Sequence, residues 1–384
     1  MPTPFKVGVL NDMSAPSSSG ARPDASDTEP WLRLAVEELA QNGRMPHRVE
    51  IVHSCGLGLP SGTAAAVEQA YAALVAQDVH LVVGPAIGDN ALIATPLAER
   101  HRLPTLHWAG AERARGEYMF QLQVGSHEDE SIVLARHLAA LGLKRVGVIY
   151  DLSPIGEQHL LFLKEEAKIL ALEVVAEGIA PLADDASGHV DRILSARVEA
   201  IVYLGLGLAA AAVARVLRER NWQGTCAMNT AGLRGYDPKF AQIIDGWIYI
   251  DMYSDANGTL AALRKRVGAP LATSFRCATR YDLARLAAEA LARAPSATRE
   301  GIKEGLERIK WLSAAEGHEG TLLGFGKYDR GALHGRYLVL RRWLNGVSVE
   351  VCADDNRAAI PPSRCETPWQ TPTDSQNRSA PQSR

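Results

Sequence analysis

Two glycine-rich turns come closest to a nucleotide-binding motif in this sequence. Gly56 and Gly58 follow an apolar run and precede a helical pattern, and Gly205, Gly207 and Ala210 occupy a similar setting. A dinucleotide site needs glycines that let the backbone approach a pyrophosphate at a helix N-terminus, and an acidic residue about twenty residues later for the ribose. Neither turn is followed by that acid. We therefore interpret both as tight strand-to-helix turns that face a cleft.

Residue types that ligate metals or act as nucleophiles are scattered. His53, His101, His107 and His159 form no HxxxH pair that would suggest a metal site. Cys55 is near His53, but alternate residues of a strand share a face without a third group to orient the histidine. The five cysteines are odd in number and have no CxxC spacing, so neither a disulfide framework nor a zinc site is indicated. The sequence predicts no catalytic residues, no metal, no cofactor and no enzyme activity.

The composition is that of an ordinary globular protein. Of the 384 residues, 47% are hydrophobic and 22% are charged, and the formal net charge is -3. Acidic and basic residues are mixed in every segment without a basic stripe, which argues against nucleic acid binding. No apolar run approaches the roughly eighteen residues of a membrane-spanning helix. We expect two domains and no membrane span.

The first residues lack the pattern of an export signal. Residues 1–4 lead directly into the apolar run of residues 5–10, with no basic segment, no long apolar core and no small-residue cleavage site. We expect a periplasmic or cell-surface location if a signal peptide is encoded upstream, and a cytoplasmic location if Met1 is the true start.

Residues 79–111 predict a strand, a turn, a helix and a second strand. The apolar run at 79–83 stops at Gly84 and Pro85, a helical period follows, and a second apolar run occupies residues 105–108. Ligands bind at the carboxyl ends of strands in an open α/β sheet. We therefore expect residues 87–90 and 107–111 to form one wall of a crevice, with Gly88, Asp89, Trp108, Ala109 and Gly110 as candidate ligand contacts.

Two of these wall residues have a second interpretation. Trp108 is placed equally well to form the wall of the crevice or a hydrophobic plug beneath it. Asp89 and Asn90 stand at the start of the predicted helix, where either side chain can cap the free backbone N–H groups.

Strand and helix patterns alternate along most of the chain. Up to residue 108 they predict a parallel, doubly wound α/β sheet, and the alternation restarts after residues 117–124 and runs to residue 252. Asn345-Gly346 lies between two apolar runs and predicts a type I′ hairpin. Asp184-Asp185 and Arg341-Arg342 are interpreted as solvated. The tail of residues 353–384 has few large apolar residues and is expected to be disordered.

Short segments in a fixed order resemble the type I periplasmic binding proteins of the branched-chain amino acid (Leu/Ile/Val) receptor family of ABC transporters, a family that also contains cytoplasmic amide sensors. The resemblance covers about residues 5–351. Its carriers are KVGVL at 6–10, LAVEEL at 34–39, VVGP at 82–85, ATPLA at 94–98, Leu103-Pro104, VGVIYD at 146–151, Tyr281-Asp282 and Gly324-Phe325.

This resemblance implies two α/β lobes joined by three crossovers, near residues 121–125, 251–255 and 324–328. The first lobe would comprise residues 1–122 and 254–326, and the second residues 123–253 and 327–352. A small ligand would be trapped between the lobes by hinge closure, without turnover. The implied partner is an ABC permease.

The family's ligand contacts are altered in this sequence. Gly88 stands where amino acid receptors have a serine, and Ile155 stands where they have an aromatic residue. None of Thr230, Ala231 and Gly232, which follow Asn229, is an acid that could take a ligand ammonium. A buried ammonium and carboxylate without partners would cost several kcal/mol. A more apolar ligand is therefore expected, such as an aromatic or alicyclic acid or amide, bound by Met13, Gly88, Asp89, Trp108, Ala109, Gly110, Ile155, Gly205, Leu206, Asn229 and Ala231.

Three functions remain open at this stage. The first is the substrate-binding protein of an ABC transporter. The second is a cytoplasmic ligand sensor of the amide-sensor type that regulates a partner protein. The third is a nucleotide-binding enzyme.

Overall fold

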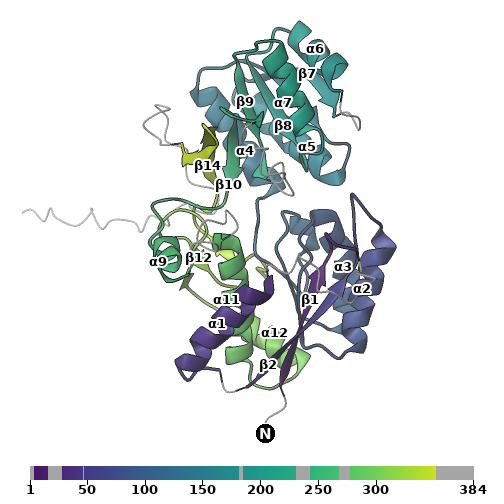
Figure 1. Cartoon of the computed structure of the whole chain (residues 1–384), viewed down its shortest axis with the longest axis vertical. Coiled ribbons are helices and arrows are strands. Elements are labelled where there is room, and N and C mark those ends of the chain that lie inside the picture. The colour runs from purple at the N-terminus through teal and green to yellow at the C-terminus, as the bar shows by residue number, and fades with distance from the viewer. Residues whose placement is uncertain are drawn as a thin grey trace, which may run out of the picture.

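The computed structural model describes residues 4–15, 28–45, 47–180, 185–230, 243–267 and 277–351. They form two α/β lobes stacked along the long axis of the molecule, each built on its own sheet (Figure 1). The expected fold class, two lobes of largely parallel sheet, is confirmed. The tail of residues 353–384 lies outside the described residues.

The sheet of the first lobe has five parallel strands in the order β2-β1-β3-β4-β5. Its longest pairing runs from Phe5 opposite Val49 to Asn11 opposite Cys55. All five carboxyl ends therefore meet at one edge of the sheet. The strands are β1 (Phe5–Asn11), β2 (Val49–Cys55), β3 (Leu81–Val83), β4 (Thr105–His107) and β5 (Met119–Gln121).

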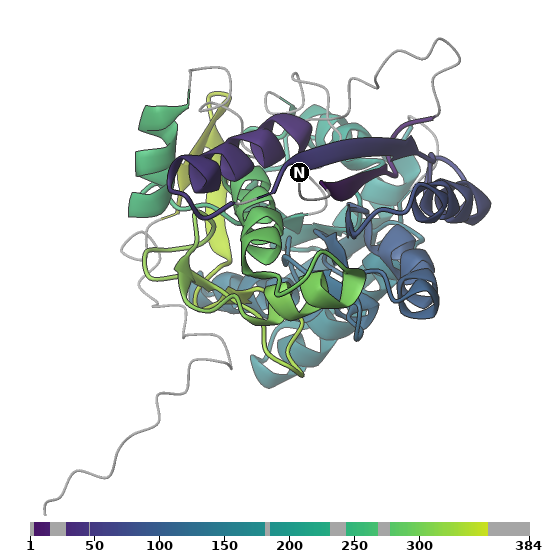
Figure 2. The same cartoon turned by 90° about the horizontal axis from the view of Figure 1, so that it is seen from below.

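Helices cover both faces of this sheet. Val7 and Val9 of β1 point to the face covered by α1, α11 and α12, whereas Leu10 points to the face covered by α2 and α3, as strand alternation requires. Figures 1 and 2 show α1 beside α11. The helices are α1 (Thr28–Gln41), α2 (Ala64–Ala76), α3 (Gly88–His101), α9 (Gly258–Arg266), α11 (Cys277–Arg293) and α12 (Arg299–Glu307), with the short η1 (Glu112–Ala114).

The second lobe contains a seven-stranded sheet in the order β15-β14-β10-β9-β8-β6-β7. Five strands are parallel, and the β14–β15 hairpin extends them as antiparallel strands. Its turn residues Asn345 and Gly346 have φ of 53° and 76°, which confirms the predicted type I′ turn. The strands are β6 (Arg145–Tyr150), β7 (Glu173–Ile179), β8 (Ala200–Leu204), β9 (Thr225–Met228), β10 (Ile248–Asp251), β14 (Val339–Leu344) and β15 (Val347–Glu350).

Two helix pairs enclose the second sheet. One face packs against α4 (His127–Ala140) and α5 (Pro154–Ile169), and the other against α6 (Ser187–Ser195) and α7 (Ala210–Glu219). Among the described residues, no helix combines the length and apolar character needed to cross a membrane.

The third crossover lies later in the chain than the sequence predicted. A small sheet of β11 (Leu312–Ser313), β12 (Leu322–Leu323) and β13 (Leu333–His334) belongs to the first lobe, because Gly331 pairs with Gln121 at the edge of β5. The chain joins the second sheet only at β14, so the crossing falls between His334 and Val339 and not at residues 324–328. Strands of two residues carry no periodicity that would reveal them in a sequence.

Candidate ligand-binding cleft between the lobes

Three apolar side chains close the space between the lobes. Ile87, just before α3 in the first lobe, forms one buried cluster with Ile155 on α5 and Leu206 after β8 in the second lobe. Their exposed fractions are 8%, 4% and 7%. Ile87 follows β3 and Leu206 follows β8, so the cluster lies where the carboxyl edges of the two sheets meet. The predicted residues Ile155 and Leu206 are therefore brought together with the predicted crevice wall.

Gly88 lies directly against this cluster. A Cβ atom built on Gly88 would be 3.2 Å from the Cβ of Ala111 and 3.6 Å from Cδ1 of Ile155. A serine here would direct its hydroxyl group at these apolar atoms. Glycine at this position therefore adds no polar group to this cluster.

Neither Asp89 nor Asn90 caps α3, so that interpretation is wrong. The N-cap residue is Ile87, and its side chain makes no capping hydrogen bond. The carboxylate of Asp12, which follows β1, accepts hydrogen bonds from the backbone N–H groups of Ala86 at 2.9 Å and Ile87 at 3.0 Å, and from Asn90 Nδ2 at 2.8 Å. Burial raises the pKa of the Asp12 carboxyl, although these hydrogen bonds oppose the shift. Asp12 therefore fixes the loop that starts α3.

Replacing Asp12 by asparagine should lower the free energy of unfolding by about 2 kcal/mol, because an amide N–H2 would then face a buried donor. Urea unfolding followed by circular dichroism measures the difference. The matched control is Asp191→Asn, which breaks the exposed ion pair with Arg220 and should leave the free energy of unfolding almost unchanged. Equal losses in the two variants would contradict a structural role for Asp12.

Asp151 repeats the role of Asp12 in the second lobe. It follows β6, and its carboxylate accepts hydrogen bonds from the Tyr203 hydroxyl group and from the backbone N–H of Gly207 at 2.9 Å. Burial raises its pKa. Asp12 follows β1, which is second from the β2 edge of its sheet, and Asp151 follows β6, which is second from the β7 edge. Each acid holds the loop after the neighbouring inner strand, β3 or β8. Neither Asp12 nor Asp151 was among the residues predicted for the site.

Asn229 and Thr230 supply polar atoms at the carboxyl end of β9. Asn229 is fully buried, and its Oδ1 accepts a hydrogen bond from the backbone N–H of Gly205 at 3.0 Å. Asn229 Nδ2 and Thr230 Oγ1 have no hydrogen-bond partner among the described residues. A buried donor left unpaired costs about 1–3 kcal/mol. These two atoms are the candidate polar contacts for a ligand.

A buried carboxylate lies beside Thr230, although residues 230–232 contain no acid. Glu130 on α4 accepts hydrogen bonds from the backbone N–H groups of Thr230 at 2.5 Å and Ser126 at 3.0 Å. Its Oε1 also lies 3.8 Å from Nε2 of His159. Each carboxylate oxygen thus accepts a backbone hydrogen bond, so Glu130 holds the loop after β9. Sequence reasoning missed it because helix α4 brings the acid from a distant part of the chain.

Two histidines pack beside Glu130. The rings of His127 and His159 have centroids 4.8 Å apart, and Nδ1 of His159 donates to the carbonyl oxygen of Ile155 at 2.9 Å. Burial, together with the neighbouring His159, lowers the pKa of His127 to about 3. His127 is therefore neutral near pH 7, which keeps this side of the junction free of added positive charge.

Trp108 belongs to the main core of the first lobe. It is 6% exposed, and the guanidinium group of Arg280 on α11 lies 4.5 Å from the centroid of its ring. Nη1 of Arg280 donates to the hydroxyl oxygen of Thr28 at 3.0 Å. This packing favours the plug interpretation, and a ligand contact from Trp108 stays a prediction.

The other predicted contacts differ in exposure. Met13 is 43% exposed, whereas Ala109 is buried. A Cβ on Gly110 would lie 3.4 Å from a carbonyl oxygen of the first crossover. Gly205 has a φ of 127°, a conformation that favours glycine. Ala231 lies outside the described residues.

Close packing accounts for the first glycine-rich turn. A Cβ on Gly56 would lie 2.2 Å from the carbonyl oxygen of Ala66, and a Cβ on Gly58 would lie 2.5 Å from the side chain of Asn90. Both glycines are therefore required by the approach of neighbouring protein atoms, as expected for a tight strand-to-helix turn.

The Cys55–His53 pair has the third group that the sequence did not reveal. Nε2 of His53 lies 2.8 Å from Oε2 of Glu29. Asn11 lies between His53 and Cys55, with its Nδ2 at 3.5 Å from Nδ1 of His53 and 3.7 Å from Sγ of Cys55. Burial raises the pKa of the Cys55 thiol, the opposite of what a nucleophile needs. Within the described ranges, no group of three His, Cys, Asp or Glu side chains could hold a metal ion.

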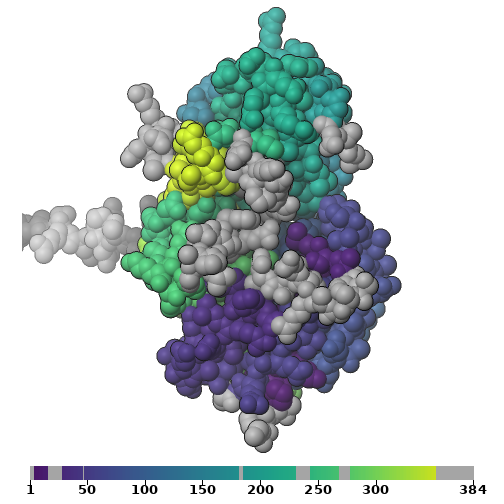
Figure 3. Space-filling view, in the orientation of Figure 1, coloured from purple at the N-terminus to yellow at the C-terminus, as the bar shows by residue number. Residues whose placement is uncertain are grey.

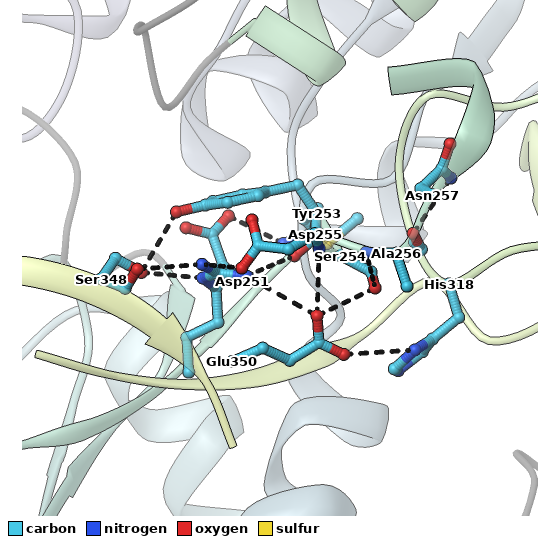
Figure 4. Close-up of polar contacts among 12 residues, drawn as sticks. Asp251, Tyr253, Ser254, Asp255, Ala256, Asn257, His318, Ser348 and Glu350 are labelled. Carbon is cyan, nitrogen blue, oxygen red and sulfur yellow. Dashed lines mark hydrogen bonds and ion pairs between the residues drawn. The ribbon is translucent and has the colours of Figure 1, made fainter. Parts of the chain in front are cut away.

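Arg341 lies at the junction of the lobes and is 1% exposed, so the prediction of a solvated side chain is wrong. Its Nη1 donates to the carbonyl oxygen of Tyr253 at 3.1 Å, its Nη2 to Oδ2 of Asp255 at 2.9 Å, and its Nε to Oγ of Ser348 at 2.7 Å. The guanidinium group also lies 3.9 Å from the centroid of the Tyr253 ring. Figure 4 shows Tyr253 and Asp255 of the second crossover beside Ser348 of the β14–β15 hairpin.

Glu350 adds a second set of contacts to the same junction. Its Oε2 accepts hydrogen bonds from Oγ of Ser254 at 2.9 Å and from the backbone N–H of Asp255 at 3.0 Å (Figure 4). Its Oε1 lies 3.6 Å from Nδ1 of His318. In the space-filling view the yellow hairpin and the green surface of α9 lie on the same edge of the molecule (Figure 3). The second crossover is thus tied to the β14–β15 hairpin, and Glu350 extends these contacts to His318 before β12.

Comparison with known families identifies the chain. A sequence profile described as periplasmic binding protein matches residues 4–338, which is most of the 384-residue chain. The chain belongs to the periplasmic binding protein family. The type I periplasmic binding protein expected from the sequence motifs is thereby confirmed. No curated protein matches the sequence significantly.

Several solved structures match the fold of this chain over almost the whole length of their own chains. A type 1 periplasmic binding protein from Bordetella pertussis Tohama I has a TM-score of 0.75 at 18% identity, with 91% of this chain and 100% of that chain covered. A leucine binding protein from Thermotoga maritima MSB8 has a TM-score of 0.73 at 17% identity, covering 91% and 99%. A branched-chain amino acid ABC transporter protein from Thermus thermophilus with bound valine has a TM-score of 0.70 at 15% identity, covering 91% and 96%. These similarities concern the fold of the periplasmic binding protein.

Proposed function

We propose that this periplasmic binding protein is the substrate-binding component of an ABC transporter. It traps a small, rather apolar or aromatic organic ligand between its lobes and presents it to a permease. Family membership and the two-lobed fold support the role in transport. The cluster of Ile87, Ile155 and Leu206 carries the proposal for the ligand.

The apolar cluster favours a ligand with a hydrocarbon body. Each lobe contributes apolar side chains where the carboxyl edges of the two sheets face each other, and Gly88 adds no hydroxyl group. Burying a ligand's apolar surface there contributes about 25 cal/mol per Å². A charged α-amino acid would bring an ammonium and a carboxylate against these side chains, at a cost of several kcal/mol.

Polar recognition is proposed to come from the second lobe. Asn229 Nδ2 and Thr230 Oγ1 are buried donors without partners in the described part of the chain. One ligand oxygen, from a carboxylate or an amide, can accept hydrogen bonds from both. The proposed ligand therefore has one polar end at β9 and an apolar body against Ile87, Ile155 and Leu206.

A thermal-shift screen tests the proposal with leucine, valine, benzoate, cyclohexanecarboxylate and the corresponding amides. A bound ligand at a hundredfold excess over its Kd raises the free energy of unfolding by about 2.7 kcal/mol. We expect the ring compounds to give larger shifts than the amino acids. Leucine giving the largest shift would contradict the apolar ligand, and no shift with any small organic compound would contradict the receptor role.

Ile155→Ala should weaken the best compound of this screen about tenfold, which corresponds to about 1.4 kcal/mol, because it removes apolar contact area between lobe and ligand. Isothermal titration calorimetry measures the change. The matched control is Ile169→Ala, which alters the same residue type on the same helix at a position that is 70% exposed. An unchanged Kd in Ile155→Ala would remove Ile155 from the site.

A further inference from the structure

We propose that the second lobe carries a separate site for a small planar organic anion, at the end of its sheet remote from the cleft. A pocket of about 490 Å³ opens there, between the last turn of α7, the first residues of β9 and β10, and Arg342 of β14. Thr225 and Ile248 in its lining begin their parallel strands, whereas the cleft lies at the carboxyl ends. A volume of this size suits a small-molecule ligand. The site is independent of the function proposed for the cleft.

Arg342 provides an unmatched positive charge in this pocket. Its Nε is buried and has no hydrogen-bond partner, and no ion pair joins Arg342 to a carboxylate, among the residues that the structure describes. A guanidinium group presents Nε–H and Nη–H as a fork that fits the two oxygens of a carboxylate. Because buried donors are almost always paired, this atom indicates a missing acceptor.

The charges around Arg342 favour an anion over a cation. Arg218 also lines the pocket, and its Nη2 donates to the carbonyl oxygen of Ile243 at 2.7 Å, which holds the side chain at the wall. Asp245 is the one acid in the lining, and its Oδ1 accepts from the backbone N–H of Gly346 at 3.4 Å. The described lining thus carries two guanidinium groups and one carboxylate, a composition that favours an anionic ligand over a cation.

Two indole rings favour a planar body for this anion. Trp222 and Trp247 both line the pocket, and Trp247 is 5% exposed. A Cβ on Gly224 would lie 2.1 Å from Cζ2 of Trp222, so the Trp222 ring rests directly on the glycine backbone. Flat aromatic rings stack on such surfaces and add to the attraction of a guanidinium group for a carboxylate. An aromatic carboxylate combines the two features.

Isothermal titration calorimetry with 2-naphthoate and its neutral amide tests this site on the intact protein. We expect saturable binding of 2-naphthoate that is at least tenfold stronger than binding of the amide. Arg342→Gln should weaken 2-naphthoate at least tenfold. Gly224→Ala should weaken it as well, because the added methyl group displaces the Trp222 ring. Equal affinities for acid and amide, or full affinity in Arg342→Gln, would overturn the proposal.

Two control variants separate this site from the cleft and from general charge effects. Ile155→Trp fills the apolar cluster between the lobes and should leave 2-naphthoate binding at Arg342 unchanged. Arg145→Gln removes a partly exposed arginine from the same lobe and should also have no effect. If Ile155→Trp abolishes all 2-naphthoate binding, the compound binds in the cleft alone and the separate site is excluded. An unchanged melting temperature of Arg342→Gln shows that its loss of binding is local.

Discussion

Arg341→Met is expected to lower the free energy of unfolding by about 3–5 kcal/mol, because it removes the buried member of a charged network. The methionine keeps much of the side-chain volume but none of the hydrogen bonds. The carbonyl oxygen of Tyr253 and Oγ of Ser348 then lose their guanidinium donors. Chemical denaturation followed by fluorescence and circular dichroism gives the difference, provided that both probes report one transition.

A solvent-exposed arginine is the control for this prediction. Arg220 forms a bidentate ion pair with Asp191 at 2.8 and 2.9 Å on the surface of the same lobe. Arg220→Met should change the free energy of unfolding far less than Arg341→Met, since solvent screens exposed pairs. Arg341→Lys should recover only part of the loss, because an ammonium group cannot reproduce the planar fork. A cost for Arg341→Met that matches the control would show that the junction is held by other contacts.

His107 is expected to make the protein less stable as the pH falls below 6.5. Its ring is fully buried, and neither ring nitrogen has a hydrogen-bond partner among the described residues. Burial, together with the charge of Arg115, lowers its pKa to about 3. The unfolded chain takes up a proton near pH 6.5 and the folded chain does not, so protonation favours unfolding. Between pH 6.5 and pH 4 this group alone should remove about 3 kcal/mol of stability.

His107→Leu isolates this contribution. The variant should lose about 3 kcal/mol less than the parent protein over that pH interval, since leucine cannot be protonated. Urea unfolding at each pH measures the slope. His101→Leu, at a partly exposed position at the end of α3, is the matched control and should keep the parent's slope. The buried His127 and His137, whose pKa values burial lowers to about 3 and about 4, stay in both variants, so the comparison isolates His107. Identical slopes in parent and His107→Leu would contradict the prediction.

The central strands could be predicted from sequence because parallel strands are buried on both faces. Residues 146–150 and 200–204 have no charged side chain, and they form most of β6 and all of β8. The helices between them have a clear apolar period. The short strands β11, β12 and β13 and the late third crossover have neither signal, and their positions depend on pairing with distant residues.

The site was predicted in part for the same reason. Ile155, Leu206 and Asn229 follow or flank strands whose ends were visible in the sequence, and Gly88 lies against the interlobe cluster as expected for a wall residue. Whether these residues contact a ligand stays a prediction. Glu130 and Arg341 could not have been identified as buried, because each also depends on a distant partner, Thr230 at 100 positions and Asp255 at 86 positions along the chain.

The sequence contains a short repeat that indicates a shared structural role for Asp12 and Asp151. The segments Val7-Gly8-Val9-Leu10-Asn11-Asp12 and Val146-Gly147-Val148-Ile149-Tyr150-Asp151 share Val-Gly-Val and the final aspartate. Both glycines also face the helix and segment that precede the neighbouring strand, with Leu74 and Val79 at Gly8, and Ile193 and Val198 at Gly147. Comparing the two halves for this short repetition would have predicted a common structural role for the two acids.

The paired acids also bear on how such a receptor can change its ligand during evolution. Asp12 and Asp151 hold their loops mainly through backbone N–H groups, whatever side chains stand at positions 87, 88 and 206. Substitutions at those positions can therefore alter the shape and polarity of the cleft while each loop keeps its anchor. A lineage can pass through single substitutions from one ligand class to another without an unfolded intermediate. The buried aspartates would be retained through that drift, and the residues that face the ligand would vary.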